Sequence, residues 1–288
     1  MIPKGLPFGI GFLGWVLDQF DFARDALQFC LDHPVDSIWL SFGDELEKYV
    51  KQLHEHNSRA TGKKIIIIVQ VNTVEEARDA VGWGIDMLVL QGIEAGGHGR
   101  NTAPPAIDLL NQIVNAGIPN IPPFVVAGGL ASGKDLVEVI RKGAAGMVIG
   151  TGFLCTAESM YTDEQKQALI SAKAGDTCRS VAWDELLGMV NWPSGINGRA
   201  LRNVTVKEHE EGVSLKERVE RFNARGPGAG VDGLVVWAGV GVGHVTTIKP
   251  AGVSALYYVW RYPVTGVTFC STLQEIVAQI MQEAEGLA

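Results

Sequence analysis

Residues 65–99 read IIIIVQVNTVEEARDAVGWGIDMLVLQGIEAGGHG, and they indicate two β-strands joined by a helix. Ile65–Val69 form an unbroken β-branched run, which is typical of a parallel strand covered on both faces. Asn72 and Thr73 are good helix caps, and acidic residues follow them in the first turn. A second apolar run, Met87–Leu90, then completes a β-α-β unit.

The same alternation of short apolar runs and amphipathic runs extends in both directions. We expect strands at Phe8–Leu13, Ser37–Phe42, Ile65–Val71, Met87–Leu90, Phe124–Ala127 and Met147–Ile149. We expect helices at Asp21–Leu31, Asp44–Asn57, Val74–Trp83, Pro105–Ala116 and Lys134–Lys142. This α/β pattern fits an open doubly wound sheet or a (β/α)8 barrel of the TIM type. No GxGxxG motif opens a helix after the first strand, so the barrel is favoured, although only six of its eight strands are counted.

Composition narrows the possible partners and locations. The 288 residues carry 24 Lys and Arg against 32 Asp and Glu, a net charge of −8, and no basic run, which argues against nucleic acid. The apolar window Gly5–Leu17 is too short for a bilayer span, and no cationic leader precedes it. We therefore expect no membrane segment and an intracellular, cytoplasmic location. The four cysteines form no CxxC pair and are expected to be reduced thiols: Cys30, Cys155, Cys178 and Cys270.

The pattern changes after Thr151 and divides the chain into two predicted parts. Residues 157–230 contain amphipathic helical runs, two tryptophans and a glycine-rich end, and we interpret them as a helical lid over the site. Residues 1–156 and 231–288 would form the barrel. Trp183 and Trp192 either line the substrate side of the lid or pack in its core.

Polar residues and glycines follow the predicted strands, where parallel sheets place their sites. His98 lies in a glycine-rich loop that follows Met87–Leu90, and an imidazole can remove a proton from a substrate near neutral pH. The alternative is that His98 only hydrogen-bonds a loop carbonyl. Gly128-Gly129 and Gly150-Thr151 follow the last two expected strands, where barrel enzymes commonly bind phosphate. Their alternative role is to form tight left-handed turns.

Three motifs, QGIEAGGHG at 91–99, VVAGG at 125–129 and VIGTGFL at 148–154, resemble the nitronate monooxygenase family, formerly called 2-nitropropane dioxygenases. The resemblance covers most of residues 8–252 and is fungal-like. It implies an FMN-dependent (β/α)8 oxidoreductase. The implied reaction is oxidation of an alkyl nitronate by dioxygen to a carbonyl compound and nitrite.

The resemblance also implies roles for particular residues. His98 matches the catalytic base of the family, and Gln91 and Gly96 match contacts to FMN. Gln70, near the end of its expected strand, is a further candidate contact to the flavin ring. The expected partners are a small-molecule substrate and dioxygen. The phosphate-binding turns correspond to Gly128, Gly129, Gly150 and Thr151.

Two departures from the family pattern bear on activity. The chain begins at what resembles the third strand of the family, so we expect a barrel that lacks its first two βα units. We expect weaker FMN binding or poor folding as a result, and a tendency to associate into oligomers. Val253–Gln274 interrupts what resembles the final helix of the family. We interpret this segment as a translated or missed intron, and the alternative is a true surface insertion.

Other interpretations stay open at this point. A related FMN enzyme, such as one resembling an enoyl-ACP reductase, would share the glycine loops, and an inactive truncated fragment would share the sequence without the activity. We expect no metal site, because the two histidines of His54-Glu55-His56 lie two positions apart on a helix and face different sides. Glu94 is expected to order its loop. His244 either touches phosphate or caps a turn.

Overall fold

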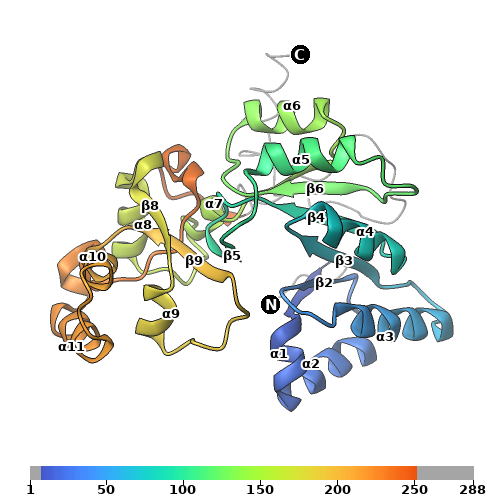
Figure 1. Ribbon diagram of the computed structural model, residues 1–288, viewed down its shortest axis with the longest axis horizontal. Helices are drawn as coiled ribbons and strands as arrows, with labels where there is room; N and C mark the ends of the chain where they lie inside the picture. Colours follow the sequence, from blue (N-terminus) through green and yellow to red (C-terminus); the bar gives the residue numbers. More distant parts are fainter. Residues whose placement is uncertain (1–7, 252–288) are drawn as a thin grey trace.

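The computed structural model describes residues 8–251, and its largest element is a six-stranded parallel sheet. The strands follow one another across the sheet in chain order (Figure 1). They are β1 (Gly9–Leu13), β2 (Ser37–Ser41), β3 (Ile66–Val71), β4 (Met87–Gln91), β6 (Phe124–Ala127) and β7 (Gly146–Val148). All six expected strands are confirmed within about two residues at each end.

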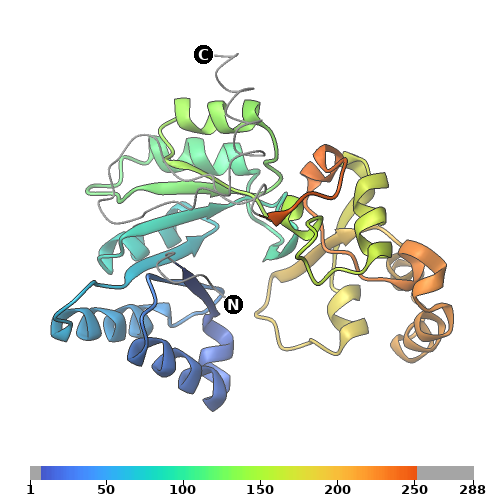
Figure 2. The same cartoon turned by 180° about the vertical axis from the view of Figure 1, so that it is seen from behind.

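The helices between these strands cover one face of the sheet and bury the main core against it. They are α1 (Gly14–Gln19), α2 (Asp21–Asp32), α3 (Leu46–Arg59), α4 (Val74–Gly82), α5 (Ala106–Asn115) and α6 (Gly133–Arg141), and Figure 2 shows them from behind. The expected Thr73 cap is confirmed, since its hydroxyl accepts a hydrogen bond from the N–H of Glu76 at 3.1 Å. The five expected helices are confirmed, whereas the short helix α1 was not predicted.

Alternate residues of each strand face opposite sides of the sheet, and this period of two sets up the site. In β3, Ile67 and Val69 join the core under the helices, whereas Ile68 faces the other side. A second apolar layer on that other side includes Met87 and Val125. This inner layer is what a barrel would enclose. Within residues 8–251 the edge strands β1 and β7 do not pair with each other, so barrel closure stays a prediction.

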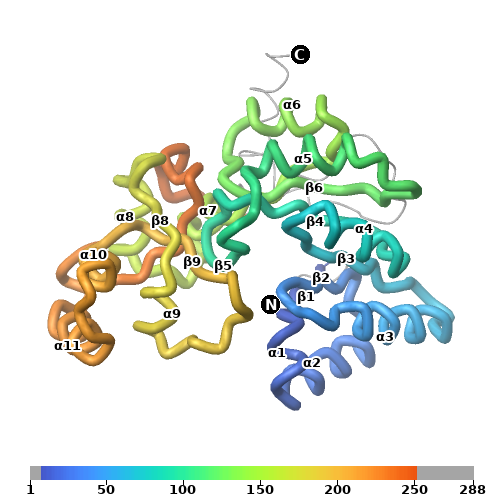
Figure 3. Tube along the Cα trace, viewed as in Figure 1, coloured from blue at the N-terminus to red at the C-terminus, as the bar shows by residue number. Residues whose placement is uncertain are grey.

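The segment 157–230, expected to be a helical lid, is not wholly helical. It contains α8 (Asp163–Ser171), α9 (Ala182–Leu187), α10 (Val204–Glu210) and α11 (Leu215–Arg225), but also β8 (Thr177–Ser180) and β9 (Ile196–Leu201). These strands form an antiparallel sheet in the order β5-β9-β8. The Cα trace in Figure 3 shows β5 and β9 side by side, where the smaller sheet approaches the parallel sheet.

The third member of this sheet, β5 (Gly97–Arg100), is the end of the glycine-rich stretch expected to be a loop. Glycine and charged residues disfavour strands, so Gly97–Arg100 carries no local strand signal. Tertiary pairing overrides that preference, because Gly97–Arg100 pairs with Ile196–Arg199 of β9, about one hundred positions away.

A second core lies under this smaller sheet. Its residues come both from the expected lid, 157–230, and from outside that range. Cys155 and Leu169 pack there with Val236. The cysteines that the structure describes are unpaired thiols: Cys30, Cys155 and Cys178. Within residues 8–251 no helix is both long and apolar enough to cross a membrane. Val253–Gln274 and Cys270 lie outside the described residues, so both interpretations of that segment stay predictions.

Candidate functional site

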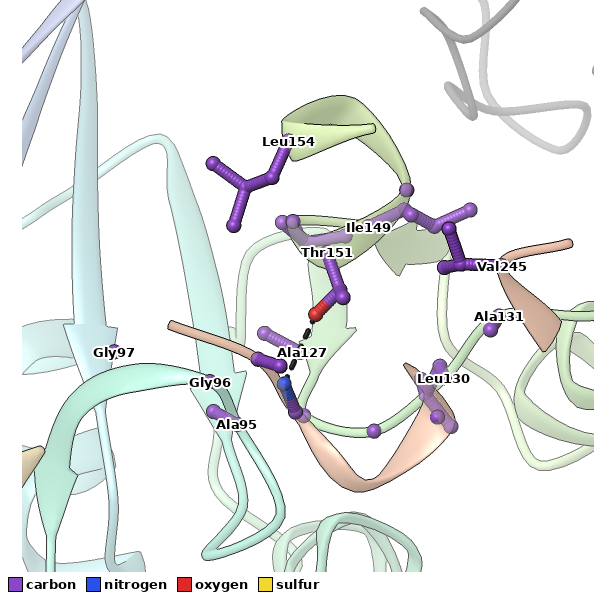
Figure 4. Close-up of a pocket in the computed structure, with 18 of the residues that line it drawn as sticks. Ala95, Gly96, Gly97, Ala127, Leu130, Ala131, Ile149, Thr151, Leu154 and Val245 are labelled. Carbon is purple, nitrogen blue, oxygen red and sulfur yellow. Dashed lines mark hydrogen bonds between the residues drawn. The ribbon is translucent and has the colours of Figure 1, made fainter. Parts of the chain in front are cut away.

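A pocket of about 470 Å³ lies where the carboxyl ends of β4, β6 and β7 meet the smaller sheet. Figure 4 shows its wall, with Gly96 and Gly97 on one side and Thr151 and Leu154 on the other. Ligand sites commonly have this size and this position at the ends of parallel strands. The structure brings all seven sequence-predicted site residues to this one pocket: Gln91, Gly96, His98, Gly128, Gly129, Gly150 and Thr151.

Two glutamines on the inner face of the sheet reach the pocket. The side chain of Gln91 is used within the protein: its Nε2 donates to the carbonyl of His98 at 3.2 Å, and its Oε1 accepts from Asn72 Nδ2 at 3.2 Å. Gln91 therefore fixes the end of β4 to β5. The Nε2 of Gln70 is buried and has no hydrogen-bond partner among residues 8–251. Because buried amides are nearly always paired, Gln70 has a donor to offer to a bound ligand.

Three of the predicted glycines are required by the backbone itself. Gly128 and Gly129 have φ of +119° and +71°, so the tight left-handed turns expected as their alternative role are present. A Cβ on Gly129 would also lie 2.6 Å from Val240 Cγ2. A Cβ on Gly96 would lie 2.4 Å from the backbone N of Gly239, so glycine lets two chain segments touch there.

Gly150 differs from these glycines, because a Cβ built on it meets nothing within 4 Å and its φ of −105° suits any residue. Gly150 lines the pocket, and the open space beside its Cα is therefore part of the cavity. The N–H groups of Gly129 and Gly150 have no hydrogen-bond partner in the described part of the chain. Thr151 Oγ1 accepts a hydrogen bond from the N–H of Gly239 at 2.9 Å (Figure 4) and keeps its own proton for donation.

His98 is held by the segment expected to be the lid. Its Nε2 lies 2.6 Å from Oδ1 of Asp184 in α9, and its ring stacks on Trp192 with 3.7 Å between centroids and 11° between planes. Trp237 approaches the same ring at 5.2 Å. The interpretation in which His98 only bonds a loop carbonyl is wrong, because its side-chain partner is a carboxylate. Trp183, in contrast, is fully buried in the core.

A guanidinium from β8 organises the loop that carries His98. Arg179 donates to the carbonyls of Ile93 at 2.9 Å and Ala95 at 3.0 Å, and also to that of Asn197 at 2.7 Å. Burial, together with the nearby charge of Arg199, lowers the pKa of Arg179 to about 10, so the group stays charged at neutral pH.

Glu94 orders the other side of this loop, as expected. Its Oε2 accepts a hydrogen bond from the N–H of Ala106, the first residue of α5, at 2.9 Å. A carboxylate at the N-terminus of a helix also interacts favourably with the helix dipole. The loop is therefore fixed from both sides, by Arg179 and by α5.

Sequence reasoning missed Asp184 and Arg179, and it did not single out Trp39 as a pocket residue. No local signal marks Asp184, because its partner His98 lies 86 positions away. His244 also lines the pocket, and its contact with a phosphate stays a prediction. Within the described residues no group of three or more His, Cys, Asp or Glu side chains is placed to hold a metal ion.

Comparisons with known proteins agree with the resemblance in the sequence. The family model described as nitronate monooxygenase matches residues 19–253. The chain is 28% identical over 242 residues to a nitronate monooxygenase of Neurospora crassa, in a match that covers 79% of this chain and 63% of that protein. It is 32% identical over 265 residues to nitronate monooxygenase npaC of Metarhizium robertsii, covering 87% of this chain and 72% of that protein. The match thus spans less than two thirds of the Neurospora protein.

Solved structures show the same fold at lower identity. FabK from Thermotoga maritima superposes with a TM-score of 0.71 at 21% identity, covering 99% of this chain and 78% of that one. Nitroalkane oxidase from Streptomyces ansochromogenes superposes with a TM-score of 0.70 at 22% identity, covering 99% and 83%. With the family match over residues 19–253, these findings show that the chain belongs to the nitronate monooxygenase family.

Proposed function

We propose that this protein oxidises alkyl nitronates with dioxygen, giving a carbonyl compound and nitrite, with FMN as its cofactor. One observation carries the proposal: the seven residues assigned from the resemblance, His98 and the glycine turns among them, lie around a single pocket. The matches to proteins named nitronate monooxygenase and nitroalkane oxidase support the same substrate class.

The residues of the pocket fit a flavin mononucleotide. The N–H groups of Gly129 and Gly150, which have no partner among residues 8–251, and the hydroxyl of Thr151 would donate to its phosphate. The buried Nε2 of Gln70, without a hydrogen-bond partner in the described part of the chain, would donate to an acceptor on the isoalloxazine ring. When bound, FMN supplies the redox chemistry, since it can take electrons from the substrate and pass them to dioxygen.

The protein groups around His98 prepare it for proton transfer. A neutral nitroalkane must lose a proton from carbon before it becomes a nitronate, and His98 would accept that proton. Trp192 and Trp237 pack against the imidazole and keep water from it. The segment 157–230 supplies both Asp184 and Trp192, which supports its expected role on the substrate side.

The function is tested by mixing the purified full-length chain, loaded with FMN, with ethyl nitronate in air. We expect acetaldehyde and nitrite to form in equal amounts, at a rate that does not depend on NADH or NADPH. Oxidation of NAD(P)H without nitrite would instead support the enoyl-reductase-like alternative. No turnover of either substrate by flavin-loaded protein would identify an inactive fragment.

A further inference from the structure

We propose that Asp184 is a positioning residue that makes Nδ1 of His98, rather than Nε2, the atom that accepts the substrate proton. This inference rests on the proposed function for its chemistry, although its structural basis is independent of it. It starts from one contact: Nε2 of His98 lies 2.6 Å from Oδ1 of Asp184.

The contact determines which ring nitrogen carries the proton. An ionised carboxylate is only an acceptor, so the nitrogen that faces it must carry hydrogen. In the neutral imidazole the lone pair is then on Nδ1. The side chains of His98 and Asp184 are only 13% and 7% exposed, which favours this direct bond over competition from water. Among residues 8–251, no group is hydrogen-bonded to Nδ1, and His98 lines the pocket.

The neighbouring rings fix the plane of the imidazole but not which of its edges faces Asp184. Trp192 lies parallel to it at 3.7 Å, which fixes the ring plane, and Trp237 is tilted by 49° at 5.2 Å. Stacking alone would allow the ring to turn over about the Cβ–Cγ bond, which exchanges Nδ1 with Cδ2 and Nε2 with Cε1. The bond to Asp184 selects one of these two ring orientations, which stacking on the tryptophans does not do.

Asp184 is itself held firmly by its helix. The next residue, Glu185, accepts a hydrogen bond from the buried guanidinium of Arg218 in α11 at 2.6 Å and lies 3.2 Å from Nδ1 of His209. The preceding residue, Trp183, is fully buried. Both neighbours of Asp184 thus anchor α9, and the carboxylate is presented to His98 from a fixed position.

The proton-transfer step is balanced without a further reactant. The C–H bond next to the nitro group breaks, and an N–H bond forms at Nδ1 of His98. The electron pair of the C–H bond moves into the new C=N bond of the nitronate, whose negative charge lies on its oxygens. The positive charge of the imidazolium formed in this step is balanced by the carboxylate of Asp184.

The test compares Asp184→Asn with Asp163→Asn, a matched change at an exposed carboxylate on α8 of the same part of the molecule. Heteronuclear NMR of ¹⁵N-histidine in the full chain with FMN reports the tautomer, and His98→Gln assigns the signal. We expect wild-type His98 to carry its proton on Nε2, and Asp184→Asn to lose this preference, because an amide can donate to Nε2. Asp163→Asn should leave the tautomer unchanged.

Kinetics with two substrates provide the second reading. In Asp184→Asn we expect kcat/KM for nitroethane to fall about 100-fold. For ethyl nitronate it should stay within about threefold of wild type, because no proton is removed from that substrate. A wild-type His98 protonated on Nδ1, or an unchanged tautomer and nitroethane rate in the variant, would overturn the inference. If wild type oxidised neither substrate, the proposed function would fail, and the tautomer would still decide whether Asp184 sets the protonated nitrogen of His98. Should the variant not fold, the wild-type tautomer alone decides that point.

Discussion

Replacing His98 with glutamine is expected to lower kcat/KM for nitroethane by about 1,000-fold, since a positioned general base commonly contributes about 10²–10⁴-fold. Glutamine cannot accept the proton, but its amide can still donate to Asp184 and so avoids leaving a buried carboxylate without a partner. Oxidation of ethyl nitronate, which needs no base, should fall far less. FMN binding should stay the same, because the phosphate and ring contacts proposed above come from other residues.

Steady-state rates with the two substrates and an FMN titration check this prediction. His54→Gln is the control, because Nε2 of His54 also makes one hydrogen bond, at 3.0 Å to the carbonyl of Trp83, but His54 lies on α3, outside the pocket lining. It should retain both rates. An equal loss of FMN binding and of both activities in His98→Gln would show that His98 supports the structure instead of removing a proton.

Replacing Arg179 with methionine is expected to cause the largest loss of stability among single changes at the site, about 3–5 kcal/mol. Methionine keeps the length of the apolar stem but removes every donor. The carbonyls of Ile93, Ala95 and Asn197 would then be left without the guanidinium that they now share. For a chain of this size the loss corresponds to a fall in Tm of roughly 5–8 °C.

Thermal unfolding measured by circular dichroism tests this, with Arg78→Met as the control. Arg78 is exposed and donates to one carbonyl, that of Ala116 at 2.9 Å. Its replacement should change stability by no more than about 0.5 kcal/mol. Equal, small effects of the two changes would mean that the loop of residues 93–99 holds its shape without Arg179.

The parallel sheet could be predicted because its strands carry their own signal. Ile65–Val69 is continuous and β-branched, and a strand covered on both faces suits such a run. Two of the helices between strands, α4 and α6, begin at caps that act locally, Thr73 and Ser132. These features depend on neighbours in sequence, so the alternation of elements was recovered from residue 8 to residue 149.

The antiparallel sheet could not be predicted in the same way, because its stability comes from pairing across long sequence separations. β5 is Gly-His-Gly-Arg, a poor strand sequence, and it is extended because β9 supplies its hydrogen bonds. Residues 157–230, expected to be helical, contain four α-helices together with the strands β8 and β9.

The site residues divide in the same way, into those that a local sequence signal marks and those that it does not. The glycine turns and His98 stand directly after strands, where a parallel sheet gathers its functional residues, and the structure brings them together. Asp184 and Arg179 act on the loop from a distant part of the chain. A lone aspartate in a short helix and a lone arginine in a strand have no spacing that marks them, so only the folded chain shows their contacts.

Titration of FMN into the purified 288-residue chain, followed by desalting and a visible absorption spectrum, tests flavin binding at this pocket. Wild type should keep a flavin spectrum. Gly150→Val should fold normally yet bind FMN at least about tenfold more weakly, because its side chain would occupy the open space of the phosphate turn. Gly62→Val, at an exposed glycine with equally open surroundings, should bind like wild type. A colourless wild-type protein, or undiminished binding by Gly150→Val, would contradict the placement of the FMN phosphate in this pocket.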